Sequence, residues 1–512
     1  MKLWPCSLLL SLLGFSGQAI AQRAYFPRSH HFYAEAGVYI SDSSRTPFWM
    51  RANQYSTVPY NTPAGTFRIG LRSDYGRPLL SGGRVTHKRF DWGYGVELVT
   101  NSERIAGNWN RTILLPEAYA KVRFHFIELW AGKRREVIGL ADSTLSTGSY
   151  AWSGNAMPLP KIQLGTPGFV SVPFTKDLFA FNGFYSHGWF DKPGFVTNSY
   201  LHQKALHIRF GRPDWGFRLY GGFNHHVQWA GFAPALPYYL ARNGYLPSRL
   251  KDYYWVVTGT HRPTQFDSTL TSMEDNRIGN HLGTVDLGMD IRMGDFNLFL
   301  YRQSLFDDGS LFYLTNIADG LNGIRLQNRR PRRAYFRINE VLGELLYTKS
   351  QGGSSFILED GKDKLRGRDD YFNHSQYQEG WTYNGRVIGS PFITPGSDLA
   401  PGLPRGAISN NRVIVVHLAA SGTLGRRTEW YLKTSYSKNY GTYSNPFPDA
   451  PTQLSTILNV TSPFELPVLG ELKLNSSFAF DSGKVLGTTA GIYVGIRKEL
   501  SAGDHPEVTQ LP

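Results

Sequence analysis

TVDLGMDIRM, at residues 284–293, alternates without a break between apolar and polar side chains. In an extended strand, successive side chains point to opposite faces, so this stretch has one apolar face and one polar face. The apolar positions are Val285, Leu287, Met289, Ile291 and Met293; the opposite positions are Thr284, Asp286, Gly288, Asp290 and Arg292. Gly294-Asp295 then predicts a tight turn. The returning stretch 296–303 sets Phe296, Leu298 and Leu300 against Asn297, Phe299, Tyr301 and Gln303.

The same alternation recurs along the chain, at 204–228, 429–436, 471–481 and 492–497. Nearly every one of these segments has charged residues on its second face. A barrel in a lipid bilayer turns its apolar face outward and its polar face toward a wet lumen. A soluble sandwich would show the same pattern with the meaning of the faces reversed. The repeated charges on one face favour the barrel.

Composition agrees with this interpretation. Aromatic residues make up 14% of the chain and charged residues only 18%, and there are 54 glycines. Ordinary soluble domains have about 25% charged residues. Outside the first residues, no stretch approaches the roughly 18 consecutive apolar residues of a membrane-spanning helix. We therefore predict an all-β fold, a transmembrane antiparallel β-barrel of about 16–18 strands.

The N-terminus predicts export. Lys2, the apolar run 8–13 and Ala19-Ile20-Ala21 have the order of a basic region, a short hydrophobic region and a cleavage site. Residues 1–21 are thus predicted to be a signal peptide, and 22–512 a single outer-membrane β-barrel domain of a Gram-negative bacterium. Cys6 is the only cysteine, so the predicted mature chain contains no disulfide.

The predicted connections alternate in length. The long ones cover roughly 136–178, 230–280, 304–334 and 351–411 and contain much of the Pro, Gly, Asn and Arg. Bacterial barrels have short turns on the periplasmic side and long loops outside the cell. We therefore expect these four segments to be long extracellular loops.

No catalytic or metal-binding motif is visible. His225 and His226 are neighbours, so on a strand they face apart, and the chain contains neither an HExxH motif nor a GxSxG elbow. Ser186 and His187 face apart for the same reason. A hydrolase site assembled across strands would leave no such motif and stays a third alternative. The prediction is no enzyme, no metal and no cofactor.

The net charge is +14, and NRRPRRAYFR at 328–337 is the densest basic cluster. Export and the absence of a nucleic-acid-binding motif argue against nucleic acid as the partner. Two partners fit this charge. One is the anionic head groups of lipids and the phosphates of lipopolysaccharide; the other is an acidic polymer, whose carboxylates arginine side chains bind with two parallel hydrogen bonds.

Seven stretches together resemble the capsule-assembly Wzi family of outer-membrane proteins. They follow the family's order along nearly the whole predicted mature chain: TPFWMRANQY (46–55), AGKRREVIGLADSTLSTGSYAWSGNAMPLPKI (131–162), YSHGWF (185–190), GFNHHVQWAG (222–231), DGLNGI (319–324), DYFNHSQYQEGWTYNGRVIGSPF (370–392) and TTAGIYVGIRKEL (488–500).

The resemblance implies a barrel of about 18 strands that binds capsular polysaccharide and helps to anchor and assemble the capsule. This role is lectin-like, without catalysis or cofactor, and it implies acidic capsular polysaccharide or exopolysaccharide and the capsule-export machinery as partners. Family members carry helices near the N-terminus that help to close the barrel. Here 31–44 alternates like a strand, so we expect no sizeable helical plug. The alternative function is a porin or transport channel for saccharides or small solutes, which needs a water-filled lumen.

The expected polysaccharide-binding residues combine hydrogen-bonding, charged and aromatic side chains. They are Asn155, Lys161, His187, Trp189, Asp191, Asn224, His226, Gln228, Asp319, Arg325, Asn373 and Trp381. Lys161 and Arg325 would contact uronate carboxylates. For Trp189 the interfacial belt of aromatic residues is favoured over a sugar-stacking platform. For Asn155, Asp319 and Asn373 the favoured alternative is the satisfaction of backbone donors within tight loops.

Overall fold

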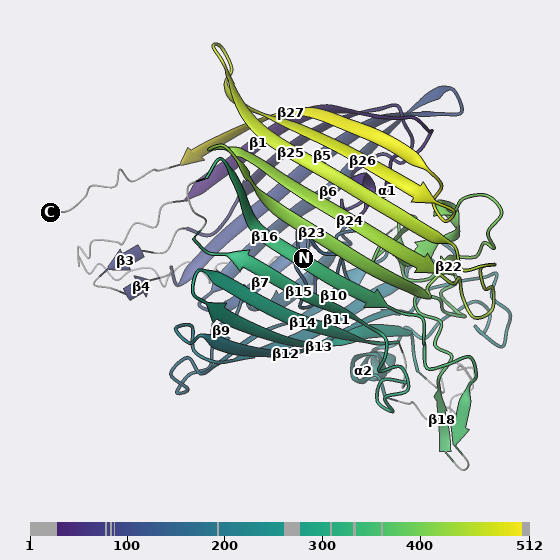
Figure 1. The fold of residues 1–512 in the computed structure, drawn as a ribbon. Helices are drawn as coiled ribbons and strands as arrows, with labels where there is room; N and C mark the ends of the chain where they lie inside the picture. Colours follow the sequence, from purple (N-terminus) through teal and green to yellow (C-terminus); the bar gives the residue numbers. More distant parts are fainter. Residues whose placement is uncertain are drawn as a thin grey trace, which may run out of the picture.

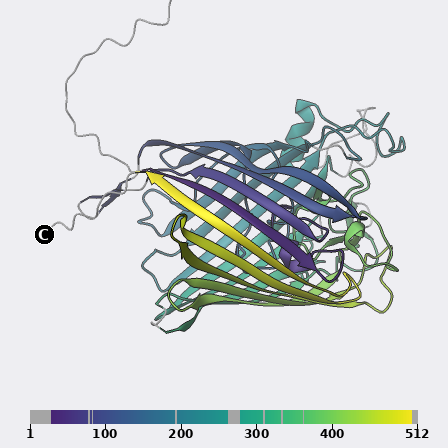
Figure 2. The same ribbon diagram turned by 90° about the horizontal axis from the view of Figure 1, so that it is seen from above.

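The chain forms a closed antiparallel β-barrel, as predicted (Figures 1 and 2). The computed structural model describes residues 28–76, 79–81, 84–86, 88–191, 194–260, 277–307, 310–330, 334–359 and 362–503. The predicted signal peptide, 1–21, lies outside these residues. The wall has 18 strands, and β1 pairs with β27 to close it. Both β8 and β9 pair with β10 and occupy one strand position.

The wall strands are β1 (Ser29–Ser41), β2 (Ala64–Ser73), β5 (Phe90–Ile105), β6 (Asn108–Phe124), β7 (Ile127–Lys133), β8 (Lys161–Gly165) with β9 (Val170–Ser171), β10 (Phe179–Trp189), β11 (Tyr200–Phe210), β12 (Phe217–Trp229), β13 (Asn280–Met293), β14 (Phe296–Phe306), β15 (Gly320–Asn328), β16 (Phe336–Tyr347), β23 (Val413–Leu424), β24 (Thr428–Asn439), β25 (Thr452–Leu466), β26 (Gly470–Gly483) and β27 (Thr489–Gly503).

The remaining described elements are short and lie between wall strands. They are α1 (Phe48–Arg51), β3 (Leu79–Ser81), β4 (Arg84–Thr86), α2 (Leu250–Thr258), β17 (Ile357–Glu359), β18 (Lys362–Arg366), β19 (Thr382–Tyr383), β20 (Arg386–Val387), β21 (Thr394–Pro395), the 3-10 helix η1 (Gly396–Asp398) and β22 (Ile408–Asn410). No helix among the described residues is long and apolar enough to cross a membrane.

The two ends of the barrel differ. The longest connections, 42–63, 134–160, 230–279 and 348–412, all leave the same end, which we call the loop end. The opposite end, the turn end, has short connections such as 125–126, 294–295 and 467–469. In Figure 1, α2, β18 and β22 lie at the loop end, and β3 and β4 at the turn end.

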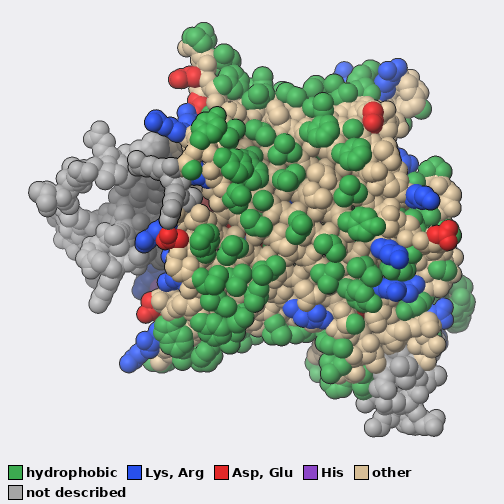
Figure 3. Space-filling view, in the orientation of Figure 1, with side chains coloured by type: hydrophobic (Ala, Val, Ile, Leu, Met, Phe, Trp, Pro, Cys, Tyr) green, Lys and Arg blue, Asp and Glu red, His purple; other side chains and the backbone are tan. Residues whose placement is uncertain are grey.

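The two faces of the wall follow the predicted alternation. Leu287 on β13 is 60% exposed on the outside, whereas its neighbour Asp286 is fully buried on the inside. Met293 pairs with Phe296, so Gly294-Asp295 forms the predicted two-residue turn. Apolar side chains are spread over the outer wall, and charged ones gather toward the two ends (Figure 3). An apolar outer surface of this kind is stable against the hydrocarbon core of a bilayer.

Two of the predicted loops include residues that form wall strands. The segment 304–334 contains β15, and 136–178 contains β8 and β9. In the sequence, the glycines of GLNGIRLQN suggested a loop. In the structure, a Cβ at position 323 would lie 2.1 Å from the ring of Tyr301, so glycine is needed there for close packing against β14. The lumen beside Gly323 is therefore closely packed.

Parts of three segments of the loop end, 42–63, 134–160 and 348–412, pack inside the barrel, and we call these segments the plug; the β17–β18 hairpin of the third segment projects away from the barrel (Figure 1). They form one apolar core with inward-facing wall residues. Its large side chains include Tyr150, Tyr371, Phe372 and Trp381, all fully buried. Within the described residues, the stretch 31–44 that alternates in the sequence lies largely in β1 (29–41), and the helix that follows it, α1, has four residues.

The outer wall yields a first prediction. Replacing Leu287 with arginine places a guanidinium midway along β13 on the apolar surface, where it loses its hydration. We expect the free energy of unfolding in lipid vesicles to fall by about 2–4 kcal/mol, measured by urea titration. Asp295→Arg, at the turn, is the control and should have little effect. Equal losses in both variants would show that Leu287 does not face hydrocarbon.

Candidate functional site

Inward-facing polar side chains of the wall hold the plug through its backbone. On β16, Glu344 accepts hydrogen bonds from the Ser146 hydroxyl at 2.7 Å and from the Thr147 N–H at 2.6 Å. On β13, Asp286 accepts from the Leu140 N–H at 2.7 Å. Each such bond satisfies a donor of a buried, irregular segment, which would otherwise lose its water partner. The polar lumen predicted from alternation therefore serves to anchor loops.

The plug segment 42–63 is bound to the wall in the same way. Asp481 accepts from the Phe48 N–H at 2.7 Å, and the Trp49 indole donates to Ser435 at 3.1 Å. Within the plug, the Trp381 indole donates to the carbonyl of Ala151 at 2.9 Å. The plug is thus tied to four wall strands, β13, β16, β24 and β26, and tied together internally.

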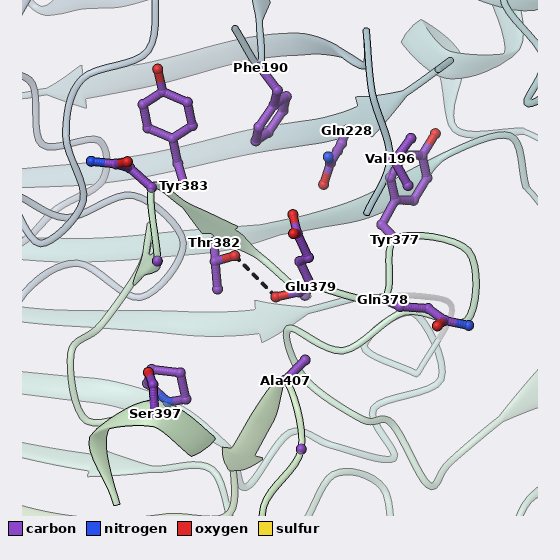
Figure 4. Close-up of a pocket in the computed structure, with 15 residues that line it drawn as sticks. Phe190, Val196, Gln228, Tyr377, Gln378, Glu379, Thr382, Tyr383, Ser397 and Ala407 are labelled. Atoms are coloured by element: carbon purple, nitrogen blue, oxygen red, sulfur yellow. Dashed lines mark hydrogen bonds between the residues drawn. The ribbon is translucent and has the colours of Figure 1, made fainter. Parts of the chain in front are cut away.

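A cleft opens on the plug at the loop end (Figure 4). This first cleft has a volume of about 460 Å³ and is lined by residues of the 190–196 connection, the end of β12 and the plug segment 377–407. Glu379 is its one charged lining residue; its side chain extends toward Gln228 in Figure 4 and accepts from the Phe195 N–H at 2.9 Å. The Thr382 hydroxyl donates to the Glu379 carbonyl at 3.1 Å.

A second cleft adjoins the first, because Gln378 and Ala407 line both. It has a volume of about 660 Å³. Its lining is more charged than that of the first cleft and combines Arg277, Arg368, Asp307, Asp369 and Asp370 with Asn373, His374 and the exposed ring of Phe356. The Arg368 guanidinium lies 5.4 Å from the centre of that ring.

We call the two adjoining clefts together the groove. It offers hydrogen-bonding amides and carboxylates, together with an aromatic face at one end. Such a mixture suits a polar, hydroxyl-rich ligand whose C–H faces pack on a ring, and such grooves are usual ligand sites.

His374 gives the groove a predicted pH dependence. Burial lowers the pKa of His374 from 6.5 to about 4. The unfolded chain therefore binds a proton between these values while the folded chain does not, and stability is lost as pH falls from 6.5 toward 4. We expect His374→Gln to remove up to about 3 kcal/mol of this loss, measured as the difference between urea midpoints at pH 7 and pH 4.5. An unchanged pH dependence in the variant would contradict the assignment.

Of the twelve residues predicted from sequence, the structure brings few to the groove. Gln228 and Asn373 line it. Asp191 lies at its edge, where it accepts from the Tyr383 hydroxyl and pairs with Lys133 at 3.0 Å. Burial, followed by the bond to Asp191, raises the pKa of Tyr383, so this phenol stays protonated and is a fixed donor.

Four predicted residues lie between wall and plug. Lys161 is 2% exposed and pairs with Glu136 at 2.6 Å. Its ammonium also donates to Gln203, whose amide contacts His226 at 2.9 Å. The Asn224 amide donates to Thr284, and Trp381 packs against His226 and Trp152. These four contribute to anchoring and filling the barrel.

Three others serve the plug and the interior rim, and two face outward. The Asn155 amide donates to the Val387 carbonyl, Asp319 accepts from the N–H groups of Ser350 and Gln351, and Arg325 pairs with Asp142 at 3.1 Å. His187 and Trp189 are on the outer face of β10 and contact each other, with Trp189 37% exposed. The latter position fits the interfacial belt that was the alternative for Trp189.

The groove residues missed from the sequence come mostly from one stretch. Gln378, Glu379, Thr382 and Tyr383 all belong to 370–392, the longest Tyr-, Gln- and Asn-rich stretch of the predicted loops. That density of polar and aromatic residues was the available signal. The sequence near these residues does not show that they face the connection 190–196. Within the described residues, no group of three or more His, Cys, Asp or Glu is placed to hold a metal ion.

The fold can now be compared with known proteins. No family model matches the chain, and no curated protein sequence matches it. Among solved structures, the barrel is similar to Wzi of Escherichia coli, described as an outer-membrane protein of group 1 capsule assembly and a carbohydrate-binding β-barrel. The TM-score is 0.54 at 14% identity, covering 91% of this chain and 84% of Wzi. The chain has the fold of an outer-membrane β-barrel.

Other solved outer-membrane barrels match with lower TM-scores. Acinetobacter baumannii OccAB4 matches with a TM-score of 0.46 and 8% identity, covering 93% of this chain and 98% of the other. At these identities the likeness extends to the fold alone.

Proposed function

We propose that this protein is a lectin-like barrel of the Gram-negative outer membrane, related to the Wzi family, that binds an acidic capsular or exopolysaccharide and helps to anchor it. The observation that carries the proposal is the plug: the lumen is packed with side chains that are tied to the wall, and the accessible groove lies on top of it. A transport channel needs a continuous aqueous path, whereas a surface-binding protein needs only an exposed groove. The likeness to a carbohydrate-binding barrel supports this choice as an analogy of fold.

In this proposal the loop end faces the outside of the cell, and the turn end, where β1 begins and β27 ends, faces the periplasm. Residues 1–21 direct export and are removed, and 22–512 form one barrel domain. The outer wall contacts lipid and lipopolysaccharide, and the polymer reaches the groove after leaving the capsule-export machinery. The protein has no catalytic role and needs no cofactor.

The polymer is held by the groove. Among the residues predicted from sequence, Gln228, Asn373 and Asp191 contribute hydrogen bonds directly or at the edge. Glu379 adds an acceptor, the Tyr383 hydroxyl oxygen can accept while its hydrogen is donated to Asp191, and Phe356 adds a stacking face. The predicted residues between plug and wall, such as Lys161 and Asn224, keep the groove in place rather than contact sugar.

The test combines two measurements on the same protein. Deletion of the gene should release surface polysaccharide into the medium with total synthesis unchanged, and purified protein in planar bilayers should show no steady ion conductance. Retained polymer together with stepwise ohmic channels would mean a pore. Shortening of isolated polymer by the purified protein would mean a hydrolase. Substituting Gln228 and Asn373 with alanine should release polymer without opening the barrel.

A further inference from the structure

Three arginines surround one tyrosine at the rim of the loop end. The guanidinium carbons of Arg45, Arg51 and Arg386 lie 5.7, 4.9 and 4.8 Å from the centre of the Tyr60 ring. Arg45, Arg51 and Tyr60 come from the plug segment 42–63, and Arg386 from 348–412. With Asp398 they form what we call the arginine cluster. Bringing three cations to one ring requires anions to offset their repulsion.

The cluster contains a single carboxylate. Asp398 Oδ2 pairs with Arg51 at 2.6 Å and with Arg386 at 3.0 Å, and the Asp398 carbonyl accepts from Arg45 at 3.4 Å. Two other carboxylates nearby are used elsewhere: Glu103 accepts from the backbone and side chain of Asn61, and Asp481 accepts from the Phe48 N–H. Neither forms an ion pair with these arginines in the part of the chain that is described.

Two buried donors of the cluster have no partner. They are Nε of Arg51, whose side chain is only 10% exposed, and the hydroxyl of Tyr60. An unmet donor at a buried site costs free energy that a bound acceptor would recover. Burial, followed by repulsion from Arg51, lowers the pKa of Arg386. The cluster therefore has both charge and donors for one more anion.

The cluster adjoins the groove. Gly385 and Ser397 line the first cleft, and Arg386 and Asp398 are the next residues along the chain (Ser397 is labelled in Figure 4). A polymer lying in the groove thus passes within reach of the cluster. The two basic residues expected from sequence to bind acidic sugars lie elsewhere: Lys161 is paired with Glu136 and Arg325 with Asp142.

We propose that the arginine cluster is the subsite for the carboxylate of a uronate residue in the polysaccharide. This inference rests on the proposed function and names its substrate class: an acidic polymer, held by charge at the cluster and by hydrogen bonds in the groove. The planar guanidinium fork of Arg386 or Arg45 matches the two oxygens of a carboxylate. Asp398 holds Arg51 and Arg386 in position for it.

The test uses two polymers with the same sugar backbone that differ at the carboxyl group, charged polygalacturonate and its neutral methyl ester, with purified full-length protein in detergent. Wild type should bind the acid more tightly than the ester, and added salt should weaken this preference. Arg386→Gln and Arg45→Gln should each reduce binding of the acid about tenfold or more, leaving binding of the ester unchanged. Arg405→Gln is the matched control, because Arg405 lies in the same plug segment and donates to the Leu399 carbonyl outside the cluster.

Folding of each variant is checked by the compact migration of the barrel on unheated gels. If one of the two single variants misfolds, the other still tests the subsite. Equal binding of acid and ester by wild type, or equal losses in Arg386→Gln and Arg405→Gln, would overturn the subsite while leaving polysaccharide binding intact. Failure of the wild type to bind the acid at all would also overturn it. The proposed function itself is judged separately, on release of the cell's own polymer after gene deletion.

Discussion

Replacing Trp381 with alanine is expected to destabilise the plug by about 3–5 kcal/mol and to make the barrel leak ions. Trp381 is fully buried at the centre of the plug, where its ring packs against Trp152 and Phe190. Its indole N–H donates to the Ala151 carbonyl and so joins two plug segments. The substitution leaves a cavity and an unmet carbonyl in a part of the molecule that no regular hydrogen-bond ladder supports.

The measurement is conductance of single proteins in planar bilayers, with urea unfolding alongside. Trp189→Ala is the matched control: Trp189 is also a tryptophan close to the loop end, but it lies on the outer face and is 37% exposed. We expect sealed barrels for wild type and Trp189→Ala and flickering openings for Trp381→Ala. Sealed barrels with unchanged stability in Trp381→Ala would show that the plug does not depend on this ring.

Replacing Glu344 with alanine is expected to open a larger and steadier conductance. The carboxylate accepts from the Ser146 hydroxyl, the Thr147 N–H and the Tyr301 hydroxyl, all buried. Removing it leaves these donors without an acceptor, at a cost of about 3 kcal/mol or more. Because Glu344 binds the plug segment 134–160 to β16, the loss falls on the contact between plug and wall.

The control is Glu499→Ala, which removes an inward-facing carboxylate at the turn end that pairs with Arg497 and Lys473 at a partly exposed site. This variant should stay sealed. Channels of equal size in both variants would point to general loosening of the wall instead of release of the plug. A sealed Glu344→Ala barrel of normal stability would mean that the segment is held by its other bonds, such as that of Leu140 to Asp286.

Candidate site residues were harder to predict than the wall. Gln228 was selected as an inward-facing residue and Asn373 as a residue of a long loop, and both line the groove. Asn224 and His226 were selected as inward-facing, and they are, but the plug covers them. A strand pattern shows which face a side chain occupies; it does not show whether that face meets water, ligand or another part of the chain.

The arginine cluster shows the same limit. Arg51 and Arg386 are 335 positions apart in numbering, and their shared partner Asp398 belongs to a short 3-10 helix. Nothing in the sequence around any one of them distinguishes it from the other arginines. Their common role arises only because two plug segments meet beside Tyr60.

Local alternation was enough to predict the kind of wall this protein has, with an apolar outward face and a polar inward face, and the tight turn between β13 and β14, although β8, β9 and β15 fell within predicted loops. These follow from a period of two residues, which is a local property that each strand carries in its own side chains. Only the tertiary structure decided that the lumen is filled and where the groove lies. Contacts such as Phe48 to Asp481 or Thr147 to Glu344 join residues far apart in the chain. Irregular segments satisfy their backbone donors wherever an acceptor lies, so no repeating pattern in the sequence records the choice.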